Sequence, residues 1–330
     1  MVNHNKLSTK AYVLKRLREA ERPLTGNELG KDAGVSRVAI WKGVHGLQAS
    51  GYSITGDEAG YRIKKDAASD SEPSDFLYPW EFAEREGNFH YWENTDSTMN
   101  RARELAEKGA AGGAVITAGT QTTGRGRNGR PWASRAGGLF FTLLERPGCP
   151  VIDYTRYSLM LLLAARKAIG NVSGKKARLR WPNDIYVENR KIAGVLTELH
   201  GEGDRLKWLS LGIGVNVNNP VPVRNMVNCA ELAGRPLSRR ELLLSILEEW
   251  SALKASDIPP GELCRLWNRS CDGIGRTVAL ARNRAEEPEG GQPDGTGVFL
   301  GTDFSGRALL RCGKTIKRLA PGKVSLRYIR

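Results

Sequence analysis

Cysteine and histidine are scarce in this chain of 330 residues, and neither residue type is clustered. The five cysteines are odd in number and form no C-x-x-C pair, which is typical of reduced thiols rather than of a disulfide framework or a zinc site. The four histidines are also dispersed, so a metal site built from protein ligands is not expected. The residues concerned are Cys149, Cys229, Cys264, Cys271, Cys312, His4, His45, His90 and His200.

Long apolar runs are missing as well. The longest, LMLLLAA from Leu159 to Ala165, is far too short to span a bilayer. The N-terminus is polar and then amphipathic, which does not fit a signal peptide. We therefore expect a cytoplasmic protein that makes no contact with a membrane.

Acidic residues are outnumbered, since 50 Lys and Arg face 36 Asp and Glu and leave a formal net charge of +14. This balance favours a polyanionic or phosphate-bearing partner, although a generally basic proteome would produce the same charge. The chain is long enough for two or three domains with at least one sizeable core.

Residues 1–65 are predicted to form a winged helix-turn-helix. Helical periodicity in LSTKAYVLKRLREA, LTGNELGKDAG and VSRVAIWKGVHGLQASG predicts three helices, of which the second stops at Gly34 and the third is capped by Ser36. YSITGDEAGYRI then predicts a hairpin. Three helices followed by a hairpin are the winged helix pattern.

The start of the third helix is the predicted DNA-contacting surface, because a recognition helix presents these positions to phosphates and base edges. A small protein-interaction module with solvated basic faces is the alternative. Within this helix Val38, Ile40, Val44 and Leu47 are available for packing. The predicted DNA-binding residues are Gly26, Ser36, Arg37, Val38, Ala39, Trp41, Lys42 and His45.

Composition divides the remaining chain into three parts. Residues 66–77, rich in Ser, Asp, Ala and Pro, are predicted to be a linker. Residues 78–268 alternate strand-like and helix-like segments and predict an α/β domain. Short strands in residues 269–330 predict a small β-barrel, which the acidic stretch Glu286–Gly297 interrupts as a surface loop.

The stretch GTQTTGRGRNGRPW, from Gly119 to Trp132, is the most informative part of the α/β domain. Glycines let backbone N–H groups converge on a ligand, and arginines suit phosphate or carboxylate. Trp132 offers a flat surface to an adenine ring. An RNA-binding tract would use the same residue types in a repeated context. Here the stretch occurs once between two apolar strands, which favours a specific anion-binding loop.

Three further segments carry polar residues in suggestive places. In RWPNDIYVENRKIAGVLTEL, Asn183 and Asp184 can bind a ribose or a metal-bound phosphate, and Lys191 follows across a hairpin that turns at ENR. A solvated hairpin lysine is the alternative. Asn216 ends a glycine-containing strand, and Ser97 directly precedes a helix, for which a plain N-cap is the alternative.

Together these segments resemble the biotin protein ligase family. GRGRNGRPW resembles the loop that holds biotinyl-adenylate in this family, and RWPNDIYV…RKIAGVLTEL resembles its W-P-N-D…K-x-A-G-x-L-x-E block. DSTMN, GIGVNVN and the closing GKVSLRYIR are similar to the family's pattern and stand in its order. With the N-terminal winged helix, the chain is similar to the bifunctional ligase/repressor branch.

The resemblance implies an α+β multidomain protein. Its central domain would be of the class II synthetase-like type, a mixed sheet with helices, and its C-terminal barrel would be SH3-like. The implied enzyme makes biotinyl-5′-adenylate from biotin and ATP, with Mg²⁺ carried by the ATP, and transfers biotin to a lysine of a biotin carboxyl carrier protein. As a homodimer loaded with the adenylate it would bind operator DNA and repress biotin genes.

The resemblance also implies roles for residues of this sequence. Lys191 and Arg127 would be catalytic, and Asp184 would deprotonate the incoming lysine. The implied biotin-binding residues are Ser97, Thr98, Met99, Gln121, Gly124, Arg125, Gly126, Arg127, Lys191 and Gly194. The implied ATP- and adenylate-binding residues are Arg125, Arg127, Arg130, Trp132, Asn183, Asp184, Asn216 and Arg327.

Three features depart from the family pattern, one of which is the segment PVPVRNMVNCAEL after Asn219, where the family usually has a Thr/Ser-containing run. Met99 stands where many members have Asn, so a polar contact near biotin is expected to be missing. The acidic insertion Glu286–Gly297 has no assigned role. Two alternatives remain open, namely a lipoate or octanoate ligase of related fold and a DNA-binding biotin sensor without catalysis.

Overall fold

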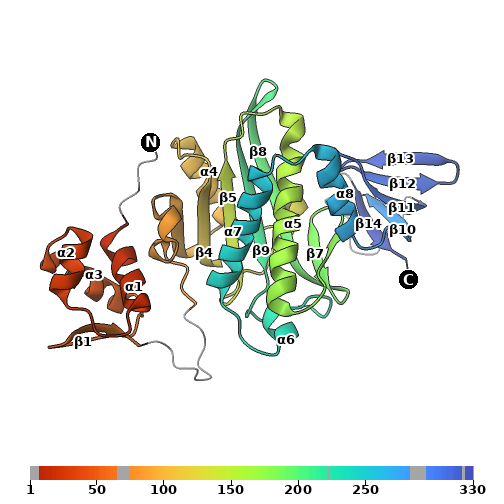
Figure 1. Ribbon diagram of the computed structural model, residues 1–330. Helices are drawn as coiled ribbons and strands as arrows, with labels where there is room; N and C mark the ends of the chain where they lie inside the picture. The colour runs from red at the N-terminus through yellow and green to blue at the C-terminus, as the bar shows by residue number, and fades with distance from the viewer. Residues whose placement is uncertain (1–6, 65–74, 222, 283–294, 322–323, 330) are drawn as a thin grey trace. The chain divides into compact units, whose positions relative to one another are not determined.

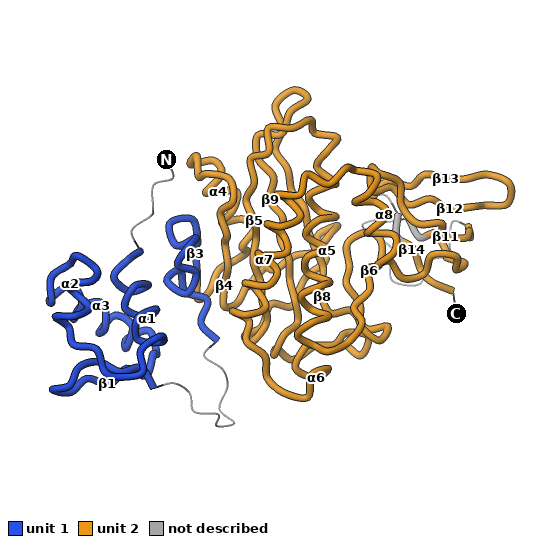
Figure 2. Tube along the Cα trace, viewed as in Figure 1, with its two compact units in different colours: residues 1–91 blue, residues 92–330 orange. Residues whose placement is uncertain are grey.

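The computed structural model describes residues 7–64, 75–221, 223–282, 295–321 and 324–329. The chain falls into two compact units, residues 1–91 and residues 92–330 (Figure 2). In the described part, no helix is long and apolar enough to cross a membrane.

The N-terminal unit begins with the predicted helices, α1 (Thr9–Glu19), α2 (Gly26–Ala33) and α3 (Arg37–Ala49), followed by the antiparallel hairpin of β1 (Ile54–Asp57) and β2 (Gly60–Ile63). The predicted local signals are confirmed. Gly34 ends α2 with a left-handed φ of 66°, and the Ser36 side chain accepts a hydrogen bond from the Ala39 backbone N–H at the start of α3.

The core of this unit is formed by one face of α3 against α1. Ile40, Val44 and Leu47 are fully buried, as expected. The expectation that Val38 packs with them is wrong, because 61% of its surface is exposed. Residues two apart on a helix do not share a face, so burying Ile40 turns Val38 outward.

Residues 76–82 pack on the winged helix. Phe76 lies against Tyr52, with ring centroids 4.6 Å apart, and the 3₁₀ turn η1 (Pro79–Glu81) buries Glu81. The Glu81 carboxylate accepts two hydrogen bonds from Arg18, at 2.7 and 2.9 Å, and one from the Tyr52 hydroxyl at 2.6 Å. A second 3₁₀ segment, η2 (Ala83–Asn88), follows. Most of the predicted linker, residues 66–74, lies outside the described residues.

The central sheet has seven strands in the order β3-β4-β5-β9-β8-β7-β6. The strands are β3 (Phe89–Thr95), β4 (Ala114–Gln121), β5 (Leu139–Glu145), β6 (Arg178–Arg180), β7 (Asp184–Val187), β8 (Arg190–Glu202) and β9 (Arg205–Val215). β5 is buried along its whole length, so both faces of the sheet are covered there.

Five α-helices lie in the described part of the second unit. They are α4 (Thr98–Glu107), α5 (Tyr154–Ser173), α6 (Cys229–Ala233), α7 (Arg239–Ala255) and α8 (Pro260–Ser270), with the short turn η4 (Val151–Asp153) before α5. α4 packs on β4, β5 and β9, whereas α5 packs on β8 and β9 with α7 beside it (Figure 1). The mixed sheet with helices is therefore confirmed.

The C-terminal part is an antiparallel sheet in the order β13-β12-β11-β10-β14, as its strand-rich sequence predicts. Its strands are β10 (Thr277–Arg282), β11 (Thr296–Thr302), β12 (Ala308–Cys312), β13 (Thr315–Leu319) and β14 (Val324–Tyr328). Residues 283–294, which hold most of the acidic insertion, lie outside the described residues.

Replacing Glu81 should destabilise the N-terminal unit. Glu81→Ala removes a buried carboxylate from the Arg18 guanidinium, whose side chain is 33% exposed, and the loss of these charge-assisted hydrogen bonds should cost about 2 kcal/mol of unfolding free energy. Urea unfolding of the full chain, followed by tryptophan fluorescence, measures the loss. Asp32→Ala, which removes an exposed ion pair with Arg16, is the matched control and should change little. Equal effects of the two substitutions would contradict the burial argument.

Candidate active site and DNA-binding surface

The loop between β4 and β5 is a narrow, hydrogen-bonded hairpin. The Gln121 N–H donates to the Ser134 carbonyl at 3.2 Å, and the Trp132 N–H donates to the Gly124 carbonyl at 2.8 Å. Nearer the tip, the Gly126 N–H donates to the Arg130 carbonyl at 2.8 Å. The 3₁₀ turn η3 (Arg127–Gly129) closes the hairpin. A loop with this defined hydrogen-bonded conformation fits a specific anion-binding loop rather than a repeated basic tract.

Gly124 is required by close packing at the base of this hairpin. A Cβ atom there would lie 2.4 Å from the Ser134 hydroxyl and 2.7 Å from the Trp132 carbonyl oxygen. Gly214 has the same role on β9, because its Cβ would lie 2.3 Å from the Trp132 indole nitrogen. These glycines let the tryptophan ring and the loop backbone approach the sheet.

The start of α4 meets this hairpin through Gln121. The Gln121 side-chain oxygen accepts from the Thr98 N–H at 2.8 Å, and its amide nitrogen donates to the Ser134 hydroxyl at 2.8 Å. The Ser97 side chain accepts from the Met99 N–H, so it is an N-cap. The N-cap is therefore confirmed, and the ligand contact stays a prediction for Ser97 and Thr98, which both line the cavity described below.

The hairpin of β7 and β8 brings Lys191 next to Asp184. Glu188 and Asn189 make its turn with left-handed φ values of 49° and 62°, at the place that ENR predicts. The Lys191 ammonium then lies 2.7 Å from an Asp184 carboxylate oxygen and 5.2 Å from the Trp132 ring centroid. Its side chain is only 23% exposed, so the solvated alternative does not hold.

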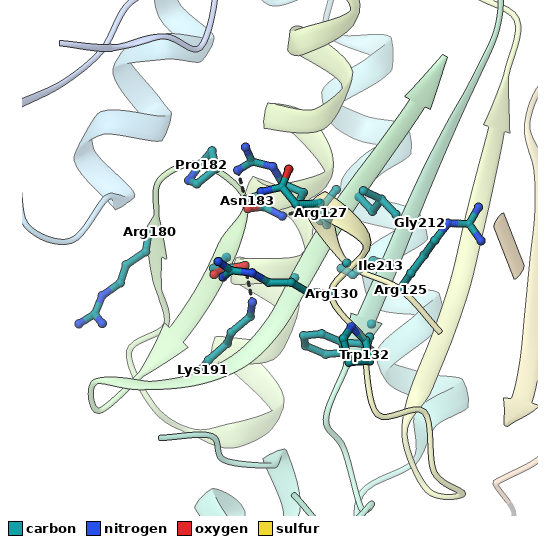
Figure 3. Close-up of a pocket in the computed structure, with 18 of the residues that line it drawn as sticks. Arg125, Arg127, Arg130, Trp132, Arg180, Pro182, Asn183, Lys191, Gly212 and Ile213 are labelled. Atoms are coloured by element: carbon teal, nitrogen blue, oxygen red, sulfur yellow. Dashed lines mark hydrogen bonds and ion pairs between the residues drawn. The ribbon is translucent and has the colours of Figure 1, made fainter. Parts of the chain in front are cut away.

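These elements enclose a cavity of about 640 Å³ (Figure 3). Arg127, Arg130 and Lys191 converge on it in this view, and Arg125 points away from them. Most of the predicted site residues line the cavity: Ser97, Thr98, Met99, Gln121, Arg125, Gly126, Arg127, Arg130, Trp132, Asn183, Asp184, Lys191 and Gly194.

Arg127 has hydrogen-bonding capacity to spare inside the cavity. One terminal nitrogen donates to the Asn183 side-chain oxygen at 3.3 Å, and Asn183 in turn donates to the Val195 carbonyl at 2.6 Å. The other terminal nitrogen is buried and has no partner among the described residues. Burial lowers the pKa of Arg127, but a guanidinium stays charged at neutral pH. A ligand oxygen would satisfy this donor.

Three predicted residues lie elsewhere. Gly124 and Asn216 line a second cavity of about 890 Å³, which shares Trp132 with the first. Arg327 is exposed on β14, and it is its neighbours Leu326 and Tyr328 that line the first cavity. Because side chains alternate along a strand, Arg327 and these neighbours point to opposite faces.

Sequence reasoning missed the aromatic wall of the cavity. Arg180 lies over Tyr186, 4.0 Å from its centroid, and 5.1 Å from the Tyr328 centroid, while pairing with Asp272 at 2.8 Å. Burial raises the pKa of both tyrosines, which stay protonated at neutral pH. The position of Arg180 next to the W-P-N-D motif was an available signal. Nothing in the sequence pairs Tyr328 with it.

Most of the predicted DNA-binding residues lie on an exposed face at the start of α3, and Gly26 lies at the start of α2. Trp41 is 48% exposed, and its ring centroid lies 4.1 Å from that of His45. Ser36, Arg37, Val38 and Lys42 are exposed beside them, whereas Gly26 and Ala39 are half-buried. A large exposed tryptophan between cations on a helix suits contact with a nucleic acid.

Comparison with known proteins gives the class to which this fold and cavity belong. Residues 91–216 match the model of the Biotin/lipoate A/B protein ligase family, and residues 9–62 match that of an HTH domain. A solved biotin protein ligase from Aquifex aeolicus, in complex with biotin and ATP, superimposes with a TM-score of 0.61 at 30% identity, covering 73% of this chain and 99% of that one.

Two curated relatives are named as ligases, and one of them also as a repressor. The Bacillus subtilis protein "Bifunctional ligase/repressor BirA" is 29% identical over 92% of this chain and 94% of its own length. The Paracoccus denitrificans "Biotin--[acetyl-CoA-carboxylase] ligase" is 32% identical over 66% of this chain and 91% of its own. The chain belongs to the biotin protein ligase family.

Replacing Gly124 with alanine should destabilise the protein, whereas the same replacement at Gly126 should not. Gly124→Ala forces the Ser134 and Trp132 contacts apart, so we expect a loss of about 2 kcal/mol of unfolding free energy and faster amide exchange in the hairpin. Gly126→Ala is the control, because its Cβ would meet its nearest neighbour at an ordinary 3.6 Å. Wild-type stability and exchange in Gly124→Ala would refute the packing role.

Proposed function

We propose that this protein is an ATP-dependent biotin ligase that also represses biotin genes. It would form biotinyl-5′-adenylate and transfer the biotin to a lysine of a biotin carboxyl carrier protein. The observation that carries the proposal is the meeting of Lys191, Asp184 and the unsatisfied Arg127 donor in one cavity beside Trp132. Family membership and the matched HTH domain support both halves.

The first step must bring two anions together. A carboxylate oxygen of biotin attacks the α-phosphorus of ATP, an O–P bond forms, and pyrophosphate leaves. Lys191 and Arg127 supply fixed positive charge where the carboxylate and the phosphate would meet. The donor of Arg127 that lacks a partner is suited to a phosphoryl oxygen. These two residues would therefore act in catalysis.

In the second step the amine of the carrier lysine attacks the carbonyl of the mixed anhydride, and AMP leaves. The amine must lose a proton. Asp184 is the acidic side chain in the cavity wall and would accept it, while Lys191 stabilises the charge that develops on the oxygen. No covalent intermediate with the enzyme is required.

The remaining wall would hold the two substrates. We assign the ureido ring of biotin to Ser97, Thr98 and Gln121, and the adenine to Trp132, with Asn216 of the second cavity as a further nucleotide contact. Met99 is buried and apolar where it meets β9, so no polar contact with biotin is assigned to it. Arg130 would contact the ATP phosphates, and Arg327 would have to act from the outer face of β14.

Mg²⁺ would neutralise the ATP phosphates. Among the described residues no group of three or more His, Cys, Asp or Glu side chains could hold a metal ion. Asp184 and Asn183 are the oxygen donors that the cavity offers. That Mg²⁺ arrives bound to ATP remains part of the proposal.

Finer features of the protein belong to the same proposal. We propose the four-part division into residues 1–65, 66–77, 78–268 and 269–330, a class II synthetase-like central domain, and closure of the C-terminal sheet into an SH3-like barrel. A homodimer in the cytoplasm would bind operator DNA through α3 when loaded with the adenylate. The described α3 surface supports DNA as the partner of that unit.

Ligation is tested by replacing Lys191. With biotin, ATP and Mg²⁺, mass spectrometry should detect bound biotinyl-adenylate, and Lys191→Ala should slow its formation on the order of a hundredfold or more. Lys207→Ala, which removes an exposed lysine of β9, is the matched control. A wild-type protein that responds to lipoate and not to biotin would replace this proposal with lipoate ligation.

DNA binding is tested at Lys42. Binding of the adenylate-loaded protein to its own biotin-gene promoter should weaken on Lys42→Ala, and the slope of log K against log salt should fall by about 1. Lys108→Ala, in the second unit, is a charge-matched control. The repressor half fails if the loaded wild-type protein binds that promoter no better than random duplex.

A further inference from the structure

The three arginines of the Gly124–Trp132 hairpin have different surroundings. Arg130, near the tip, is exposed, and Arg127 keeps a buried donor without a partner in the described structure. Arg125, at the base, has every nitrogen engaged. Its Nε and Nη2 donate to one Glu198 oxygen at 3.3 and 2.9 Å, and its Nη1 donates to the Asn100 side-chain oxygen at 2.9 Å.

Glu198 is held as firmly as the arginine that it binds. Its second oxygen accepts from Arg103 of α4 at 2.8 Å, so the carboxylate lies between two guanidinium groups. Burial alone would raise the pKa of Glu198, but the hydrogen bonds from Arg103 and Arg125 outweigh it and lower the pKa. Glu198 therefore stays ionised at neutral pH, and it does not line the cavity.

The same cluster reaches the start of α4. Asn100, which accepts from Arg125, donates its amide to Asp96 at 2.6 Å. Asp96 also accepts from the Ser97 N–H at 2.7 Å, directly before the cavity residue Thr98. The base of the hairpin is thus tied to β8 by a charge pair and to the first turn of α4 by a hydrogen-bond relay.

We propose that Arg125 is a positioning residue, which acts through Glu198 to fix the base of the hairpin, whereas the ligand contact proposed above stays with Arg127. Figure 3 shows this division, with Arg125 directed away from Lys191 and Arg127 directed toward Asn183. The inference rests on the proposed ligase activity only for its first readout, the rate of adenylate release.

Replacing Glu198 distinguishes a positioning role of Arg125 from direct contact between Arg125 and the ligand. If Arg125 gripped the adenylate, removing Glu198 would free it, and retention of the adenylate would stay the same or improve. If Arg125 is an anchor, Glu198→Ala and Arg125→Ala should each speed adenylate release on the order of tenfold, since a charge-assisted hydrogen bond is lost in both. The double variant should release the adenylate no faster than either single variant, because each single substitution already removes the Arg125–Glu198 pair.

Conservative variants separate the anchor from a general packing role. Glu198→Gln keeps a side-chain oxygen that can accept from Arg125 and should restore most of the retention. Arg125→Lys keeps the charge but loses the fork that reaches both Asn100 and Glu198, so it should behave like Arg125→Ala. Glu202→Ala, four residues further along β8 in an exposed pair with Lys207, is the matched control and should behave like the wild type.

A second readout needs no ligand. In the free protein, hydrogen exchange of the Gly126 and Trp132 amides, which bond across the hairpin, should accelerate in Glu198→Ala and not in Glu202→Ala. Unchanged exchange together with unchanged or slower adenylate release would overturn the inference. If wild-type protein forms no biotinyl-adenylate, the ligase proposal fails, and the exchange result still decides the anchor.

Discussion

The ion pair between Lys191 and Asp184 is the constraint on which the site depends. In the proposed reaction, a lysine that faces two anionic reactants must be partly shielded from water and held in one position. A separation of 2.7 Å from Asp184 meets these conditions, and it exists because the turn at Glu188 and Asn189 sets the register of β7 against β8. The glycines that admit Trp132 then place an aromatic face over the same ammonium.

Much of the cavity could be predicted from sequence because its residues lie in contiguous motifs. Local sequence signals predict the structure of three of these segments. Glycines mark the hairpin loop, a cap marks the start of α4, and a left-handed turn marks the β7–β8 connection. Local signals of this kind survive in the fold because they depend on neighbours in the chain. The same reasoning located α1 to α3 and the hairpin of β1 and β2.

What sequence reasoning missed depends on parts of the chain brought together by tertiary packing. The side of β14 that faces the cavity follows from its pairing with β10, so Tyr328 rather than Arg327 lines the wall. The outward position of Val38 follows from which face of α3 meets α1. The partner of Arg125 lies 73 residues away on β8. It is Glu198, the last residue of the K-x-A-G-x-L-x-E block, but the block does not indicate which arginine this glutamate binds.

The packing of residues 76–82 on the winged helix bears on where this chain can be divided. Trp80 donates to the Tyr52 hydroxyl at 3.1 Å, and Glu81 takes its hydrogen bonds from Arg18 and Tyr52. A ligase fragment cut at residue 78, at the boundary that composition suggests, would carry this tryptophan and carboxylate without the helices that cover them. Such a fragment would expose an aggregation-prone surface that is covered in the full chain. A cut that keeps residues 76–82 with the DNA-binding part would leave the core of each fragment intact.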